Sequence, residues 1–213
     1  MDSWRAWAEA LQRQIGSNEK HENFRVRVIA GKLRSRKLQS LPGMDIRPTS
    51  DKLRETLFNV LTAGNPSRLE GKIWIDLFAG TGAVGIEAIS RGASPVYFVE
   101  GAPAAVELIR ANLRSLGIDG GFQILAQDVS RTLRALVEKE IRADFIFLDP
   151  PYKLTDIYSS TLSALSHSSL LTQTSVVIAE HEKRFDPGET FGELHRYRKL
   201  IQGDAALSFY RLG

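Results

Sequence analysis

The residue types best suited to chemistry stand at a proline-rich corner, Asp149-Pro150-Pro151-Tyr152. It follows an apolar run over 144–148 that we expect to be a buried strand. Two consecutive prolines make a stiff, non-helical turn at the carboxyl end of that strand, where open α/β sheets bind ligands. The corner offers a carboxylate, the Pro150 carbonyl and an aromatic ring, which suit a planar base with an exocyclic amine. A structural turn with a buried tyrosine is the alternative.

A glycine loop lies upstream of this corner. Gly80, Gly82 and Gly85 match the pattern GxGxxG between an expected strand over 73–78 and an expected helix over 83–91. Glycines let the backbone approach a ligand closely, and the helix N-terminus behind them favours an electron-rich group. Glu100 ends the next expected strand, so the pattern predicts a ribose-bearing cofactor rather than a structural turn.

Acidic residues near the loop distinguish between cofactors. NAD or FAD fits the glycine pattern, but Asp76, four residues before Gly80, places a carboxylate where a cationic amine fits better than a pyrophosphate. S-adenosylmethionine carries an ammonium and a sulfonium and no pyrophosphate. Glu100 would hold its ribose hydroxyls and Asp128 its adenine amine, with helix capping or loop solvation as the alternative for Asp76 and Asp128. The expected cofactor site comprises Asp76, Phe78, Ala79, Gly80, Thr81, Gly82, Glu100, Gly101, Asp128 and Val129.

With this cofactor, the corner becomes an expected catalytic site for methyl transfer to an amine. Such an amine is a poor nucleophile because its lone pair is delocalised. Catalysis should come from aiming that lone pair at the methyl group and stabilising the positive charge that develops. Asp149 is suited to the second task, and Tyr152 to stacking on the base. The predicted catalytic residues are Asp149, Pro150, Pro151 and Tyr152.

Basic residues are concentrated near the N-terminus. Six of them fall within thirteen residues that contain no acid, leaving 22 basic and 25 acidic residues elsewhere in a chain of net charge +3. The segment is either a patch for polyanions or a solvated strand pair. Its members are Arg25, Arg27, Lys32, Arg34, Arg36 and Lys37.

The elements that position these residues alternate between strand and helix from residue 72 onward, which predicts right-handed βαβ units and a mainly parallel sheet. Two strands over 194–201 and 206–212 form a C-terminal antiparallel hairpin. Upstream we expect a short helix over 2–15, a linker over 17–23, and a hairpin over 24–41 with its turn at Ala30-Gly31-Lys32. A helix over 52–61 follows, capped by Thr49, Ser50 or Asp51.

Composition excludes several classes. With 213 residues, 43% hydrophobic and 25% charged, the chain is an ordinary globular protein. The absence of cysteine removes disulfides, zinc–thiolate sites and thiol nucleophiles, and the four histidines show no metal-ligand spacing, so we expect no metal. No apolar run approaches the roughly 18 residues of a membrane span, and no signal peptide is evident, so a cytoplasmic location is expected. Nothing requires more than a monomer.

These motifs together resemble the RsmD family of bacterial 16S rRNA (guanine-N2) methyltransferases. The resemblance rests on Arg27-Val28-Ile29-Ala30-Gly31-Lys32-Leu33-Arg34, on Arg47-Pro48-Thr49-Ser50-Asp51 followed by Arg54-Glu55-Thr56-Leu57-Phe58-Asn59, on Asp76-Leu77-Phe78-Ala79-Gly80-Thr81-Gly82, and on the proline-rich corner. It implies a Rossmann-like, S-adenosylmethionine-dependent α/β fold with a seven-stranded sheet and helices on both faces. It also implies methylation of the guanine amine at position 966, in conventional 16S numbering, on the small ribosomal subunit.

The resemblance further implies that the N-terminal hairpin and the 47–54 segment hold RNA and close over the cofactor site. The expected RNA contacts are Arg25, Arg27, Lys32, Arg34, Arg36, Lys37, Arg47 and Arg54. The expected division is an N-terminal extension over 1–23, a hairpin and helix over 24–66, and the methyltransferase domain over 67–213. Residues 1–23 precede the family pattern as an extension, a partner-binding helix, or the product of a start codon placed upstream.

Three other functions remain open from the sequence. A DNA adenine-N6 methyltransferase would use the same corner, although no separate target-recognition domain is evident. A non-catalytic RNA-binding protein would retain the fold alone. An NAD-dependent oxidoreductase would use the literal glycine pattern.

Overall fold

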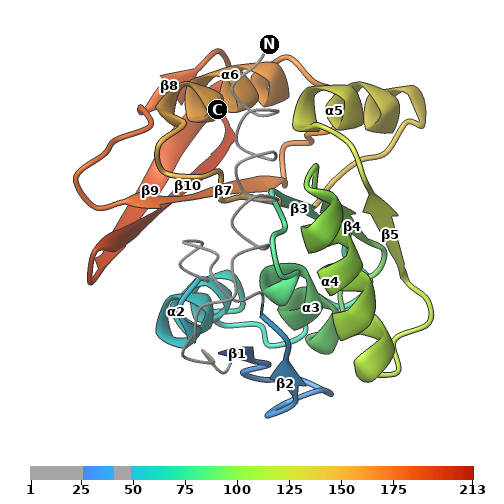
Figure 1. Cartoon of the computed structure of the whole chain (residues 1–213). Coiled ribbons are helices and arrows are strands. Elements are labelled where there is room, and N and C mark those ends of the chain that lie inside the picture. Colours follow the sequence, from blue (N-terminus) through green and yellow to red (C-terminus); the bar gives the residue numbers. More distant parts are fainter. Residues whose placement is uncertain (1–25, 41–48) are drawn as a thin grey trace.

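The computed structural model describes residues 26–40 and 49–213. Its main feature is an eight-stranded sheet of order β5-β4-β3-β6-β7-β10-β9-β8 (Figure 1). Within it, β3 to β7 run parallel and the last three strands antiparallel. The expected helix over 2–15, its linker, Arg25 and Arg47 lie outside the described residues. The strands are β3 (Trp74–Leu77), β4 (Val96–Val99), β5 (Phe122–Leu125), β6 (Phe145–Leu148), β7 (Val176–Glu182), β8 (Thr190–Phe191), β9 (Leu194–Gln202) and β10 (Ala205–Leu212).

The predicted mainly parallel α/β fold with a C-terminal hairpin is confirmed, but the predicted count of seven strands is wrong. The eighth strand is β8, which pairs Thr190 with His195 and Phe191 with Leu194 at the edge of the sheet. A strand of two residues is too short to produce the alternation of apolar and polar residues by which strands are found in a sequence.

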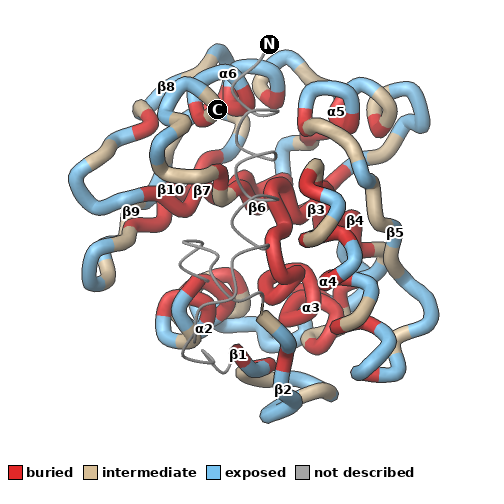
Figure 2. Tube along the Cα trace, viewed as in Figure 1, coloured by how far each residue is buried: buried red, intermediate tan, exposed pale blue. Residues whose placement is uncertain are grey.

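Helices cover both faces of the sheet (Figures 1 and 2). One face packs against α2 (Asp51–Leu61), α3 (Ala83–Ser90) and α4 (Pro103–Ser115), and the other against α5 (Val129–Glu138) and α6 (Thr155–Ser166). Successive strand residues point to opposite faces. Trp74 therefore lies on the α2 side, with its ring 5.3 Å from that of Phe58 and 5.7 Å from that of Phe145. Its neighbour Ile75 belongs to the other core.

The N-terminal hairpin is confirmed in outline, with its turn displaced. Its strands β1 (Val26–Arg27) and β2 (Lys37–Leu38) have two residues each, and the turn spans 32–35 instead of 30–32. The reason is tertiary, because the Ile29 and Ala30 N–H groups donate to the Glu87 carboxylate of α3 (2.7 and 3.0 Å). Gly31 (φ +79°) lies so close to this helix that a Cβ would stand 2.0 Å from the Ser90 carbonyl oxygen.

Helix α2 begins after Ser50, one of the three predicted caps, whose hydroxyl accepts a hydrogen bond from the Leu53 N–H (3.2 Å). Arg54, on the first turn of α2, is fully buried. Its guanidinium donates to the carbonyls of Arg27 (2.6 Å) and Thr49 (3.2 Å). The expectation that Arg54 contacts RNA is therefore wrong, because a buried guanidinium that ties β1 to the start of α2 cannot reach a phosphate.

Replacing Arg54 tests this structural role. We expect Arg54→Met to lower the free energy of unfolding by about 2–4 kcal/mol, because the two carbonyls lose their donor while buried. Urea unfolding followed by circular dichroism measures the change. Lys52→Met on the exposed side of the same helix is the matched control and should stay within about 0.5 kcal/mol of the parent. Equal stability of the two variants would contradict the assignment.

Candidate functional site

Four carboxyl groups meet where the parallel strands end. Asp76 lies in β3, Glu100 follows β4, Asp149 follows β6, and Glu180 lies in β7. In the register, Asp76 pairs with Phe147 and Leu148 with Ala179, so Asp149 lies on the same face as Asp76 and beside Glu180. We call these four residues the acidic edge. It stands at the carboxyl ends of the strands, the edge at which open α/β sheets bind ligands.

Asp76 is buried and holds the start of α3 in place. Its Oδ2 accepts a hydrogen bond from the Gly85 N–H at 2.8 Å. A Cβ on Gly85 would lie 2.3 Å from the Phe98 ring, so only glycine allows the helix to approach this closely. Burial raises the pKa of Asp76 to about 8, against the opposing effect of the Gly85 hydrogen bond.

The glycine loop between β3 and α3 contains three residues in the left-handed region: Phe78 (φ +62°), Gly80 (φ +54°) and Gly82 (φ +76°). The first is notable because a side chain makes this conformation costly, and such strain concentrates at functional sites. Neighbouring contacts hold the loop, since the Ala79 N–H donates to the Val99 carbonyl at 3.0 Å. The predicted loop residues 78–82 therefore form one turn at the strand ends, tied to β4 by this hydrogen bond.

Glu100 joins this loop to the next strand. Its Oε2 accepts a hydrogen bond from the Gly80 N–H (2.9 Å), and its Oε1 accepts one from the Ala102 N–H (2.8 Å). Burial raises the pKa of Glu100 to about 7, although the hydrogen bonds from Ala102, Gly80 and Gly101 lower it. The structure thus brings together the loop, Glu100 and Gly101, as expected from the sequence. Their contact with a cofactor stays a prediction.

Asp128 has a structural role of its own. It is the N-cap of α5, where its Oδ1 accepts a hydrogen bond from the Arg131 N–H at 2.9 Å. This is the capping alternative left open by the sequence. Val129, the first residue of α5, is buried beside it. A contact between Asp128 and adenine stays a prediction.

The proline-rich corner at 149–152 follows β6 directly. Its Tyr152 hydroxyl lies 3.5 Å from Glu180 Oε1, and the Thr49 hydroxyl donates to Glu180 Oε2 at 2.7 Å. Glu180 therefore connects the corner to the segment that leads into α2. Burial raises the pKa of Asp149 well above its usual range, and the nearby charges of Glu180 and Asp76 raise it further.

Two residues of this region were missed from the sequence. Glu180 was not singled out as a site residue, although an acid at the carboxyl end of the strand next to β6 was a usable signal. Tyr158 of α6 is buried, and its hydroxyl donates to the Glu180 carbonyl at 2.8 Å, with the Pro150 carbonyl at 3.4 Å. No sequence signal distinguished it from other apolar residues of α6.

The turn between β1 and β2, with the start of β2, presents basic side chains to solvent. The exposed basic residues of this segment are Lys32, Arg34, Arg36 and Lys37, which we call the basic turn. Arg36 also donates to the Ser115 carbonyl at the end of α4 (3.1 Å), so the turn contacts this helix. Arg27 is exposed too and pairs with Asp51 at 3.1 Å. These residues remain candidates for RNA contact, unlike Arg54.

Among residues 26–40 and 49–213, no group of three or more His, Asp or Glu side chains is placed to hold a metal ion. Over those ranges, no helix combines the length and apolar character needed to cross a bilayer.

The chain is similar in sequence to rRNA methyltransferases and matches one family model over most of its length. A family model described as "Conserved hypothetical protein 95" matches residues 26–211. The chain is 33% identical to "Putative rRNA methyltransferase YlbH" of Bacillus subtilis, over 87% of this chain and 98% of that protein. It is 32% identical to "Ribosomal RNA small subunit methyltransferase D" of Haemophilus influenzae, over 74% of this chain and 79% of the relative. The chain belongs to the RsmD family.

Solved structures agree with this RsmD-family assignment. "Putative methyltransferase yhhF from Escherichia coli" superposes with a TM-score of 0.73 at 26% identity, covering 88% of this chain and 98% of that one. A Thermus thermophilus 16S rRNA N2 G1207 methyltransferase, solved with AdoMet and guanosine, has a TM-score of 0.68 at 20% identity. The match covers 90% of this chain and 50% of that one, and it shows a shared fold. The fold is thus that of the Rossmann-like methyltransferases.

The raised carboxyl pKa values predict how stability depends on pH. Asp76 titrates at about 8 and Glu100 at about 7 in the folded chain, against 3.8 and 4.5 as ordinary values. Between about pH 4 and pH 8 the folded chain holds protons that the unfolded chain has released. The contribution of these groups to the free energy of unfolding therefore falls as pH rises, by up to about 1.4 kcal/mol per pH unit for each group.

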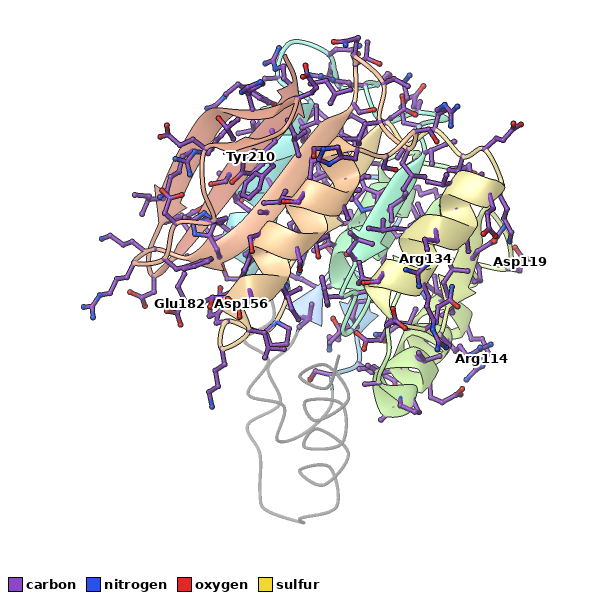
Figure 3. All side chains as sticks on the ribbon, turned by 90° about the horizontal axis from the view of Figure 1, so that it is seen from above. Arg114, Asp119, Arg134, Asp156, Glu182 and Tyr210 are labelled. Carbon is purple, nitrogen blue, oxygen red and sulfur yellow. The ribbon has the colours of Figure 1, made fainter. Side chains whose placement is uncertain are left out.

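Urea unfolding between about pH 5.5 and pH 7.5 measures this slope. We expect Asp76→Asn to flatten it, because the amide keeps the shape and does not titrate. The matched control is Asp119→Asn, which alters an exposed acid at the periphery of the molecule (Figure 3) and should keep the parent slope. An Asp76→Asn variant with the parent slope would show that Asp76 does not hold a proton in this range.

Proposed function

We propose that the chain is an S-adenosylmethionine-dependent methyltransferase that modifies the N2 amine of a guanine in 16S rRNA of the small ribosomal subunit. The observation that carries this proposal is the acidic edge, which places four carboxyl groups around a glycine loop and a proline-rich corner. A dinucleotide with its anionic pyrophosphate does not suit this concentration of acids. A cofactor with two cationic centres does.

The residues present fit this cofactor. S-adenosylmethionine supplies an electrophilic methyl group on a positively charged sulfur. Asp76 offers a buried carboxyl to the ammonium, and Glu100, already within the loop, offers its oxygens to the ribose hydroxyls. Burial has raised both pKa values, so a cation placed beside these groups would favour their ionised forms and release protons. Phe78, Ala79, Gly80, Thr81, Gly82 and Gly101 form the backbone of this site, and Asp128 and Val129 its adenine end.

The proline-rich corner would hold the base. Asp149 and the Pro150 carbonyl accept the two amine hydrogens, Pro151 stiffens the turn, and Tyr152 stacks on the ring. The raised pKa of Asp149 favours its neutral form in the free chain, and the cationic cofactor beside it would favour the ionised form, which stabilises the positive charge that develops on the amine during transfer. Glu180 fixes Tyr152 and adds negative potential beside Asp149. The corner therefore orients the amine and also stabilises the positive charge that develops on it.

The choice of rRNA and guanine is supported by the relatives. Two of them are named as rRNA methyltransferases, one of the small subunit, and a protein of the same fold was solved with AdoMet and guanosine. RNA loops offer unstacked bases, which suits a corner that needs the base turned out. We assign phosphate contacts to the basic turn, with Arg25, Arg27 and Arg47 as further candidates.

The remaining assignments follow from this function. Residues 24–66 form the part that holds RNA and covers the cofactor site, and residues 67–213 the methyltransferase domain. A monomer is sufficient, because this chain supplies every group that the proposed reaction uses. Its substrate places the protein in the cytoplasm.

Methyl transfer from labelled S-adenosylmethionine to small ribosomal subunits that lack the native modification tests the proposal. Nucleoside mass spectrometry of the digested RNA should show N2-methylguanine. Asp149→Ala should keep cofactor binding and lose at least about 100-fold in rate, because the acceptor that orients the amine and stabilises its charge is gone. Asp156→Ala, at an exposed acid in the first turn of α6, is the matched control and should retain the parent rate.

Other outcomes of the same experiment each contradict part of the proposal. N6-methyladenine in a parallel DNA sample, with unlabelled RNA, would show that the substrate is DNA adenine. Binding of S-adenosylmethionine without any methyl transfer would favour a non-catalytic RNA-binding protein. Binding of NADH in place of S-adenosylmethionine would show that the cofactor is a dinucleotide. Full activity of Asp149→Ala would remove Asp149 from the catalytic role.

A further inference from the structure

Asn112 of α4 joins three parts of the chain that are far apart in sequence. Its side chain is fully buried. The Oδ1 atom accepts a hydrogen bond from the Gln39 N–H at 2.7 Å, and Nδ2 donates to the Gln39 carbonyl at 3.1 Å. The same Nδ2 donates to the Thr81 carbonyl at 3.0 Å. One planar amide thus fixes the positions of Gln39 and Thr81 relative to each other.

The two partners of Asn112 belong to different functional regions. Gln39 follows β2 directly, two residues after Lys37 of the basic turn, and Arg36 of that turn bonds to the same helix α4 at the Ser115 carbonyl. Thr81 stands between the two loop glycines, and its neighbour Gly80 donates to Glu100. Asn112 is therefore a short, buried link between the basic turn and the glycine loop.

The hydrogen-bonding groups of the Asn112 side chain favour a coupling role, because they bind both partners at once. An asparagine side chain has one acceptor oxygen and two donor hydrogens, and the contacts to Gln39 and Thr81 account for one acceptance and both donations. Displacing the 37–40 segment would leave buried polar groups unpaired on Asn112, which carries a free-energy cost. Fixing that segment fixes the amide plane and with it the Thr81 carbonyl.

We propose that Asn112 is a positioning residue that couples RNA binding at the basic turn to cofactor binding in the glycine loop. The inference rests on the proposed function, because it takes S-adenosylmethionine and rRNA as the two ligands. RNA that holds the basic turn steadies Gln39, and Asn112 transmits this order to Thr81. Coupling of this kind is reciprocal, so each ligand raises affinity for the other by the same factor, typically about 5–150-fold.

The test compares the affinity for S-adenosylhomocysteine, the unreactive product of the cofactor, with and without saturating unmethylated small ribosomal subunits. Equilibrium dialysis of the labelled compound gives both dissociation constants. For the parent chain we expect binding to be at least about 5-fold tighter with subunits present. In Asn112→Asp, whose second oxygen cannot donate to the two carbonyls, this ratio should fall to within about 2-fold of one. Asn112→Ala removes the same link without adding charge and covers the case in which the aspartate variant fails to fold.

Ser115→Ala provides the matched control on the same helix. Ser115 is exposed, and its hydroxyl donates to the Asn112 backbone carbonyl within the helix, so the variant should keep the parent ratio. An asparagine with a purely structural role would weaken binding equally with and without subunits and leave the ratio unchanged in both Asn112 variants, which would overturn the proposal. A parent ratio of one would also overturn it. Failure of the parent chain to bind either ligand would instead contradict the proposed function on which the inference rests.

Discussion

Burial of carboxyl groups at the ends of parallel strands is the constraint on which the site depends. A carboxyl group removed from water favours its neutral form unless a cation or hydrogen-bond donors stabilise the charge. At the acidic edge, backbone N–H groups and the Thr49 hydroxyl donate hydrogen bonds to the carboxyl oxygens. Among these donors, the Gly80 N–H belongs to the glycine loop and the Gly85 N–H to the start of α3. The loop conformation and the raised pKa values are therefore two consequences of one arrangement, which prepares the edge for a cationic ligand.

The N-terminal segment extends this arrangement toward the surface. Glu87 of α3 binds the N–H groups of Ile29 and Ala30, and Arg54 of α2 binds the carbonyl of Arg27. Polar contacts thus place the basic turn against α3 and α4, although β1 and β2 are too short to be stable alone. The small basic surface is therefore attached to α3 and α4, the helices that border the glycine loop.

The sequence predicts those features whose cause is local. Alternating apolar runs gave the order of strands and helices, and glycine and proline spacing located the loop and the corner. What it missed depends on contacts between distant segments. The turn after β1 is displaced because Ile29 and Ala30 donate hydrogen bonds to Glu87 of α3. Arg54 resembled a surface cation because its carbonyl partners are brought to it by the fold. The contacts of Glu180 and Asn112 are to residues far away in the sequence, and no spacing rule identifies such partners.

The central claim is that buried, partly protonated carboxyl groups receive the cationic cofactor, and calorimetry tests it directly. Titrating the protein with S-adenosylmethionine at about pH 7, in buffers of different ionisation enthalpy, counts the protons exchanged on binding. With Asp76 titrating at about 8 and Glu100 at about 7, we predict the release of about one proton for each cofactor bound. Binding heats that do not depend on the buffer, or that show proton uptake, would contradict the account.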